Sequence, residues 1–196
     1  AARKLSRTGH TSWTLTEIDF TDGPYLSQNT TSTTLTPSGT SGSVNITASA
    51  SLFAATDVGR LVSFSNGRAK ITGFTSATVV AATTQDDFDN TNAVSTWKLG
   101  AFSGTTGHPS CVSFFEQRLV FAGTSSEPQT LYFSKAGDYE NMTSGTNADD
   151  AMVYTIASNQ VNRIRYLKSQ RTLIVGTTGG EFTVSADGTD AAITPT

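Results

Sequence analysis

Apolar and polar positions alternate most clearly on either side of the dipeptide Asn66-Gly67. Asn-Gly is the preferred pair for a two-residue type I′ turn, because both turn positions need a positive φ. A hairpin closed by this turn pairs Phe64 with Ala69 and Val62 with Ile71. All four apolar side chains then lie on one face, as burial of that face requires. The pattern therefore predicts a β-hairpin in this register.

Shorter apolar or alternating runs predict strands along much of the remaining chain. They are Val44–Ala48, Ala77–Ala82, Val94–Leu99, Val112–Phe115, Leu119–Ala122, Thr130–Ser134, Leu173–Val175 and Glu181–Ser185. The strands between about 43 and 100 are typical of a small β-barrel or sandwich.

The first 42 residues carry weaker patterns. Residues 1–25 predict extended structure with Trp13 and Leu15 on one face, and Asp22-Gly23-Pro24 ends the run as a turn. Residues 27–42 consist mostly of Ser, Thr, Gly and Asn. This composition favours a flexible linker, while a loop or short edge hairpin is an equally good interpretation.

A short repeat links two parts of the second half. Gln117-Arg118 and Gly123-Thr124 recur as Gln170-Arg171 and Gly176-Thr177 at a constant offset of 53 residues. A β-repeat with a period near 50 has the size of a propeller blade. A propeller needs about four or more blades, and only about one and a half fit here. We therefore expect an all-β fold of partial β-propeller blades, with the remaining blades outside these 196 residues.

The composition supports strands rather than helices. Thr occurs 34 times and Ser 23 times, and only 15% of the residues are charged. An average domain carries about 25% charged residues, so hydroxyl groups replace charge as the solubilising groups here. Long helices are favoured by Ala, Leu, Glu, Lys and Arg, whereas Thr packs well in strands.

The remaining counts exclude several protein classes. A net charge of −3 gives no basic footprint for wrapping nucleic acid. No apolar run approaches the roughly 20 residues of a membrane helix. The single cysteine, Cys111, excludes an internal disulfide framework. The chain begins without Met and without a signal-peptide pattern, so we expect either that its start was removed or that it is a piece of something longer.

Candidate catalytic and metal-binding residues are few. His108 and Cys111 invite a nucleophile–base interpretation, but Cys111 opens an apolar strand, where a free cysteine is usually a small hydrophobe. Asp86, Asp87 and Asp89 could bind a hard cation, as could Asp149-Asp150. Acidic solvated turns are the better interpretation, because the first loop lacks the glycine and distal glutamate of a calcium hand.

Two further segments have a chemical and a structural interpretation. The glycine-rich run 176–180 is followed by a strand pattern rather than a helix, which favours a hairpin turn over a phosphate loop. A basic stretch contains Arg163, Arg165, Lys168 and Arg171. A solvated outer face is the favoured interpretation. An inter-subunit or DNA-backbone contact is the more specific functional alternative. The sequence thus assigns no catalytic, cofactor-binding or metal-binding residue.

An ordered set of segments is similar to a known family. The segments are Leu5-Ser6-Arg7, Trp13-Thr14-Leu15, Asp22-Gly23-Pro24-Tyr25, Asp57–Leu61, His108-Pro109-Ser110, Phe114–Thr124, Pro128-Gln129, Ser134, Gly137-Asp138-Tyr139, Asn141-Met142, Asp149-Asp150-Ala151 and Gly180-Glu181. Together they resemble the tail nozzle proteins of short-tailed bacteriophages, the tail tubular protein B-like family.

The resemblance implies a structural role without catalysis. Such nozzles are hexameric tubes below the tail adaptor, with β-propeller modules, inserted β-domains and a lumen through which double-stranded DNA passes. Residues 1–26 would complete an upstream portion, 27–100 would form an inserted small β-barrel or sandwich, and 101–196 would form incomplete blades.

The implied partners are further copies of the chain, the tail adaptor and tail fibre or spike proteins. The implied location is the virion, after synthesis in the bacterial cytoplasm. A hydroxyl-rich, weakly acidic surface suits a conduit, because few cations would hold the DNA phosphates.

Two other function classes stay open. A carbohydrate-binding or adhesive β-module would stack sugars on exposed aromatic side chains, such as Trp13, Trp97 and tyrosines. An enzyme, such as a propeller hydrolase, ranks last because no carboxylate pair or nucleophile–base set stands out.

Overall fold

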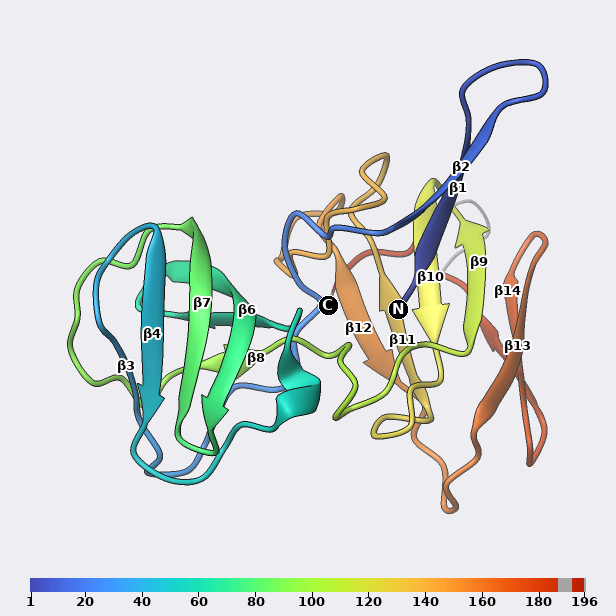
Figure 1. Ribbon diagram of the computed structural model, residues 1–196. Coiled ribbons are helices and arrows are strands. Elements are labelled where there is room, and N and C mark those ends of the chain that lie inside the picture. Colours follow the sequence, from blue (N-terminus) through green and yellow to red (C-terminus); the bar gives the residue numbers. More distant parts are fainter. Residues whose placement is uncertain (187–191, 196) are drawn as a thin grey trace. The chain divides into compact units, whose positions relative to one another are not determined.

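The computed structural model describes residues 1–186 and 192–195. Within this range the chain forms four antiparallel sheets and one short 3₁₀ helix, Ala55–Asp57. The prediction of an all-β fold is confirmed. The chain divides into two compact units, one of residues 25–105 and the other of residues 1–24 together with 106–196 (Figure 1).

The unit of residues 25–105 contains one six-stranded sheet that curls into a half-barrel. Its spatial order is β3-β4-β7-β6-β5-β8. The strands are β3 (Leu35–Pro37), β4 (Ser43–Ala48), β5 (Leu61–Phe64), β6 (Gly67–Ser76), β7 (Val79–Asp86) and β8 (Lys98–Leu99). Main-chain hydrogen bonds between Leu35 and Val94 tie β3 to the segment that leads into β8. The concave side holds a core of its own, built mainly from Val, Ile, Ala and Phe side chains.

The β5–β6 hairpin exists, but its predicted register is wrong. Its turn residues are Ser65 and Asn66, both with positive φ (49° and 57°), and Gly67 already pairs with Phe64. A Cβ at Gly67 would lie 2.6 Å from the Asp87 carbonyl oxygen, so the strand needs glycine there for close approach. The pairing shifts by two residues from the prediction. An even shift keeps every side chain on its predicted face, which is why the predicted apolar face is nonetheless buried.

The Ser/Thr-rich segment 27–42 is not a linker in the structure. Its Leu35 is fully buried and begins strand β3, which pairs with β4 as an edge hairpin. The Asn29 side chain donates to three carbonyl groups, those of Thr31, Thr33 and Ser95. The second of the two sequence interpretations, a loop with a short edge hairpin, is therefore the one found. The strand expected over Val94–Leu99 is shorter than predicted and covers Lys98–Leu99.

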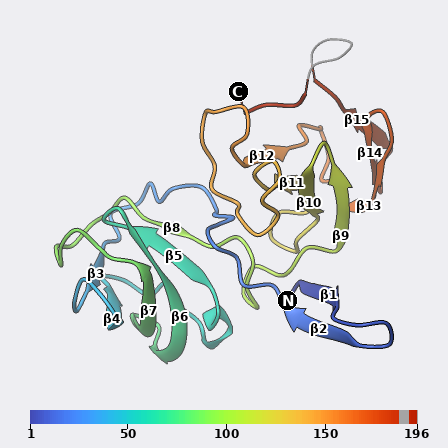
Figure 2. The ribbon, with the colours of Figure 1, turned by 90° about the horizontal axis from the view of Figure 1, so that it is seen from above.

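The other unit contains two meandering sheets and a separate hairpin (Figure 2). One sheet runs β12-β11-β10-β9, with β9 (Cys111–Phe115), β10 (Arg118–Ala122), β11 (Thr130–Phe133) and β12 (Met152–Thr155). The next runs β13-β14-β15, with β13 (Ile164–Ser169), β14 (Leu173–Thr177) and β15 (Glu181–Val184). Side chains from both sheets share one core.

The 53-residue offset of the sequence repeat recurs in this core. Strand β9 begins at Cys111 and β13 begins 53 residues later at Ile164, and both side chains are buried in the shared core. The same offset relates Val120 to Leu173, and both of these are fully buried. The connecting turns differ, because the turn before β10 uses two residues with positive φ and the turn before β14 does not.

Candidate functional site

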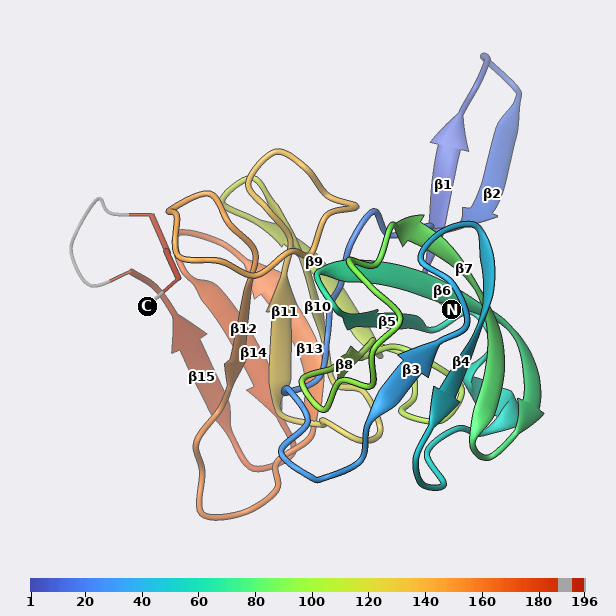
Figure 3. The same ribbon diagram turned by 90° about the vertical axis from the view of Figure 1, so that its left-hand side faces the viewer.

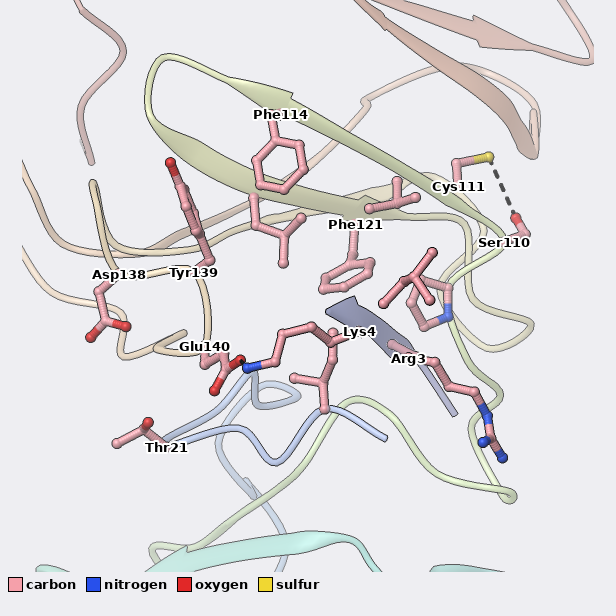
Figure 4. A pocket seen from close by; sticks show the side chains of 16 residues that line it. Arg3, Lys4, Thr21, Ser110, Cys111, Phe114, Phe121, Asp138, Tyr139 and Glu140 are labelled. Carbon is pink, nitrogen blue, oxygen red and sulfur yellow. Dashed lines mark hydrogen bonds and ion pairs between the residues drawn. The ribbon is translucent and has the colours of Figure 1, made fainter. Parts of the chain in front are cut away.

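The second unit carries a pocket of about 720 Å³ (Figure 4). Its walls come from the start of the chain, from residues 18–21, from β9 and β10, and from the loop 138–140. All of these segments belong to the same compact unit.

The floor of the pocket is the outer face of the β9–β10 hairpin. Phe114 pairs with Leu119 and Val112 pairs with Phe121, so these four apolar side chains share one face. Val112 and Phe114 remain 57% and 58% exposed. The inner face of the same sheet carries Cys111, Val120 and other members of the shared core. This sheet is therefore apolar on both faces, although only the inner one is covered by a second sheet.

The rim of the pocket is polar and mixed in charge. Lys4 donates to Glu140 across it, and Figure 4 shows the two side chains end to end. Tyr139 meets Phe114 edge to face, with ring centroids 5.1 Å apart. Such a site suits an apolar or aromatic group held by a few polar contacts at its edge.

A two-stranded hairpin at the start of the chain projects from its unit (Figures 1 and 3), and its first strand supplies residues that line the pocket. We name it the arm; it consists of β1 (Arg3–Arg7), β2 (Trp13–Glu17) and their connection. The cross-strand pair Leu5–Leu15 and the side chain of Trp13 share one face, because opposite residues point the same way. Leu5 and Leu15 are 62% and 58% exposed. The guanidinium of Arg7 lies 5.7 Å from the Trp13 ring centroid. Sequence analysis predicted extended structure here but missed the hairpin.

Buried Arg118 organises the loop beside the pocket. Its guanidinium donates to the carbonyl groups of Ser134, Ala148, Asp149 and Asp150. Burial lowers the pKa of Arg118, against the opposing effect of nearby carboxylates. The strand predicted from the sequence starts at Leu119, yet Arg118 is the first residue of β10, and its buried side chain binds four carbonyl groups.

His108 and Cys111 do not form a nucleophile–base pair. The Cys111 thiol donates to the Ile164 carbonyl over 3.8 Å in the buried core. His108 is largely exposed, and the partial burial of its ring lowers its pKa. The alternative in which Cys111 is a small buried hydrophobe is the one that the structure favours.

Four of the five acidic candidates, Asp86, Asp89, Asp149 and Asp150, have protein partners. Asp86 lies 2.9 Å from the Arg68 guanidinium, and Asp89 accepts a hydrogen bond from the Asn66 side chain. Asp150 accepts a hydrogen bond from the backbone N–H of Asn147. Across residues 1–186 and 192–195, no cluster of three or more acidic, His or Cys residues could hold a metal ion.

The glycine-rich and basic segments lie on the second meander. Residues 178–180 connect β14 to β15, which confirms the predicted hairpin turn. Gly176 lies under the ring of Tyr166, where a Cβ would come within 2.0 Å of the ring. The four basic side chains at 163, 165, 168 and 171 are all exposed. The ladder of β13 shifts between Ile164 and Tyr166, so the strand is irregular at Arg165.

Only some of the aromatic side chains that were expected to be exposed for sugar binding are exposed. Trp97 is only 8% exposed, and its indole N–H donates to the Thr33 carbonyl over 2.8 Å. It is a core residue of the half-barrel and offers no surface for a sugar. Trp13 is exposed on the arm, and Phe114 and Tyr139 are exposed at the pocket.

No protein family matches this sequence, and no curated protein matches it with significance. In the described part of the chain, no helix is long and apolar enough to cross a membrane.

Proposed function

We propose that this chain is a structural component of a bacteriophage tail, a part of the nozzle wall through which the genome is delivered. The observation that carries the proposal is the β9–β12 meander with an apolar outer and an apolar inner face. A sheet with two apolar faces needs a cover on each: the β13–β15 sheet covers the inner face, as the next blade of a propeller does, and the outer face would be covered by a neighbouring subunit of the tube.

The arrangement of the two sheets supports blades. Strands β9, β10 and β11 are followed 53, 55 and 51 residues later by the starts of β13, β14 and β15, and both groups meander in chain order. The second group packs on the inner face of the first through a shared core. In this proposal the two sheets are consecutive blades of an incomplete β-propeller.

The order of the units along the chain supports an insertion. The half-barrel is one continuous segment, 25–105, whereas the other unit is assembled from the residues on both sides of it. We therefore propose that residues 27–100 are an inserted β-domain, that 101–196 are propeller blades, and that 1–26 complete an upstream portion of that propeller.

The proposed partners and location follow from the role. Six copies would form the tube, joined to the tail adaptor and to fibre or spike proteins, within the virion. Double-stranded DNA would pass without specific binding, because a weakly acidic wall offers few cations for its phosphates.

The proposal is tested on purified protein and on phage particles. We expect mass photometry and negative-stain microscopy of the full-length protein to show a closed ring of six with a central channel. Mass spectrometry of purified virions should find the protein in a matching copy number. A protein that stays monomeric under every condition and is absent from virions would contradict the proposal.

A carbohydrate-binding or adhesive module is the second candidate. The exposed Phe114–Tyr139 pair beside the pocket favours it, because aromatic faces next to polar groups stack on sugars. Saturable binding on a glycan array that is lost in Tyr139→Ala and kept in Phe74→Ala would support it. Phe74 is a matched exposed aromatic on β6 of the half-barrel.

A further inference from the structure

We propose that the arm of one copy of this chain docks its apolar face on the pocket of a second copy. The inference rests on the proposed function, since it names the two surfaces that would join neighbouring subunits of the nozzle wall.

The arm carries an apolar face that its own copy leaves uncovered. Leu5, Leu15 and Trp13 share this face, and each is more than half exposed. The opposite face carries Lys4, Ser6, Thr14 and Thr16. Strand β2 alternates as a strand that buries one side does, although Arg3, Arg7 and Glu17 lie on the same face as the three apolar side chains. An isolated two-stranded hairpin is marginally stable in water, so a cover on the apolar face would also stabilise the arm.

The pocket is a matching receptor. Its floor offers Val112 and Phe114 on the uncovered face of the β9–β12 sheet. In its own copy only the base of the arm, residues 2–5, reaches this pocket. The distal half of the arm, with Trp13 and Leu15, lines no part of it.

Charge complementarity identifies a second copy as the occupant. The arm carries Arg3, Lys4 and Arg7 against a single acid, Glu17. The loop at the other wall of the pocket, residues 138–140, carries two acids, Asp138 and Glu140, and no base. Within one copy Lys4 pairs with Glu140 from the polar face of the arm. Arg3 and Arg7 lie on the apolar face, so docking of that face on a second copy would bring them to its acidic rim at Asp138.

The arm and the pocket are different patches, so this contact is head to tail. A head-to-tail contact closes into a ring when its rotation permits and otherwise continues as a filament. Each copy would give one arm and receive one.

The experiment uses the whole chain and measures self-association by sedimentation velocity over a concentration series. The arm variant is Leu15→Ser, which changes the apolar face without touching the pocket of its own copy. The pocket variant is Phe114→Ser. Each should weaken association by about tenfold or more, as expected for a central apolar anchor. Thr14→Ser on the other face of β2 and Phe74→Ser in the half-barrel should leave association unchanged.

Mixing the two variants gives the sharpest outcome. A pair of one arm variant and one pocket variant keeps one intact arm and one intact pocket. The mixture should therefore form dimers and nothing larger, while each variant alone stays monomeric. Circular dichroism checks the fold, and Val112→Thr replaces Phe114→Ser should the latter unfold.

Three results would overturn the proposal. One is a wild-type chain that stays monomeric at every concentration. Another is wild-type association in both variants. The third is loss of association in the pocket variant alone, which would assign the pocket to another segment or partner. Rings of six that persist in both variants would refute arm docking and leave the nozzle proposal intact. Dimers or filaments that depend on both the arm and the pocket would support arm docking. If the protein were at the same time absent from virions, the nozzle proposal would be refuted.

Discussion

At the scale of single residues, the buried pair Arg60–Asp57 stabilises the half-barrel. The two side chains lie 2.9 Å apart and are almost fully buried. Arg60 also donates to the Gly100 carbonyl over 2.7 Å, and Asp57 accepts from the Ala54 N–H. Burial lowers the pKa of Arg60, and the Asp57 carboxylate opposes that effect. The segment 57–61, one of the segments that resemble the nozzle family, thus stabilises the packing of the half-barrel.

Replacing Asp57 should be costly. Asp57→Ala leaves the Arg60 guanidinium buried without its carboxylate, and we expect a loss of about 3–5 kcal/mol in the free energy of unfolding. Urea denaturation followed by fluorescence measures it. Asp86→Ala is the matched control, because the Asp86 side chain is 54% exposed and such pairs contribute less than about 1 kcal/mol. Equal losses in the two variants would refute this account.

Asp150 should make the loop beside the pocket sensitive to acid. The hydrogen bond from the backbone N–H of Asn147 and the nearby Lys135 ammonium, 3.1 Å away, hold the pKa of Asp150 below its ordinary value. The folded protein therefore favours the charged carboxylate. This contribution is complete above the ordinary aspartate pKa, about 4, and is lost as pH falls through the lowered pKa.

Unfolding measured between neutral and acid pH checks this expectation. Asp150→Asn should be less stable than the wild type at neutral pH, and the difference should shrink steadily on acidification. A difference that stays constant with pH would show that the carboxylate charge contributes nothing.

At the scale of elements, Gly67 fixes the register of the β5–β6 hairpin. Gly67→Ala would place a Cβ 2.6 Å from the Asp87 backbone oxygen and 2.7 Å from the Phe88 ring, and overpacking of this kind costs about 1–3 kcal/mol. Gly73→Ala on the same strand β6 meets only Ala81, at 3.6 Å, and should cost less. Thermal unfolding compares the two. A larger loss for Gly73→Ala would contradict this explanation.

The elements also show what the sequence could and could not predict. Local apolar patterns located most strands, because a strand with one buried face must alternate. The turn at Asn66 was misplaced by one residue, since the Cβ clash at Gly67 comes from residues 87–88, about twenty positions away. The burial of Trp97 and the order in 27–42 had the same cause. Trp97 donates to Thr33 and Asn29 donates to Ser95, and both are long-range contacts.

The candidate site was less accessible to sequence reasoning. The pocket joins the start of the chain to residues more than 100 positions away, such as Glu140. One signal was present: β10 reads Arg-Leu-Val-Phe-Ala, with apolar side chains at four consecutive positions. Such a run indicates a strand buried on both faces, and it would have pointed to the apolar outer face.

At the scale of the whole molecule, the half-barrel should fold alone. Residues 25–105 hold their own core and form one continuous segment. We expect a fragment of residues 25–105 to unfold cooperatively in urea and to give a dispersed amide NMR spectrum. The companion deletion, with Pro24 joined to Thr106 through a short glycine–serine linker, should keep the β9–β15 core. A fragment without cooperative unfolding would show that the half-barrel depends on the rest of the chain.

The paired ends of the half-barrel have a mechanical consequence. The incoming segment bonds antiparallel to the outgoing one, through the Tyr25–Gly100 bridge, the Leu26–Leu99 hydrogen bond and the Asn29–Trp97 hydrogen bond. A force that pulls residues 24 and 106 apart loads these bonds one after another, as in opening a zipper, and never all together in shear. The half-barrel would lengthen the chain between the two parts of the other unit once the bonds of Gly100 to Leu61 and of Gly104 to Thr56 had opened as well.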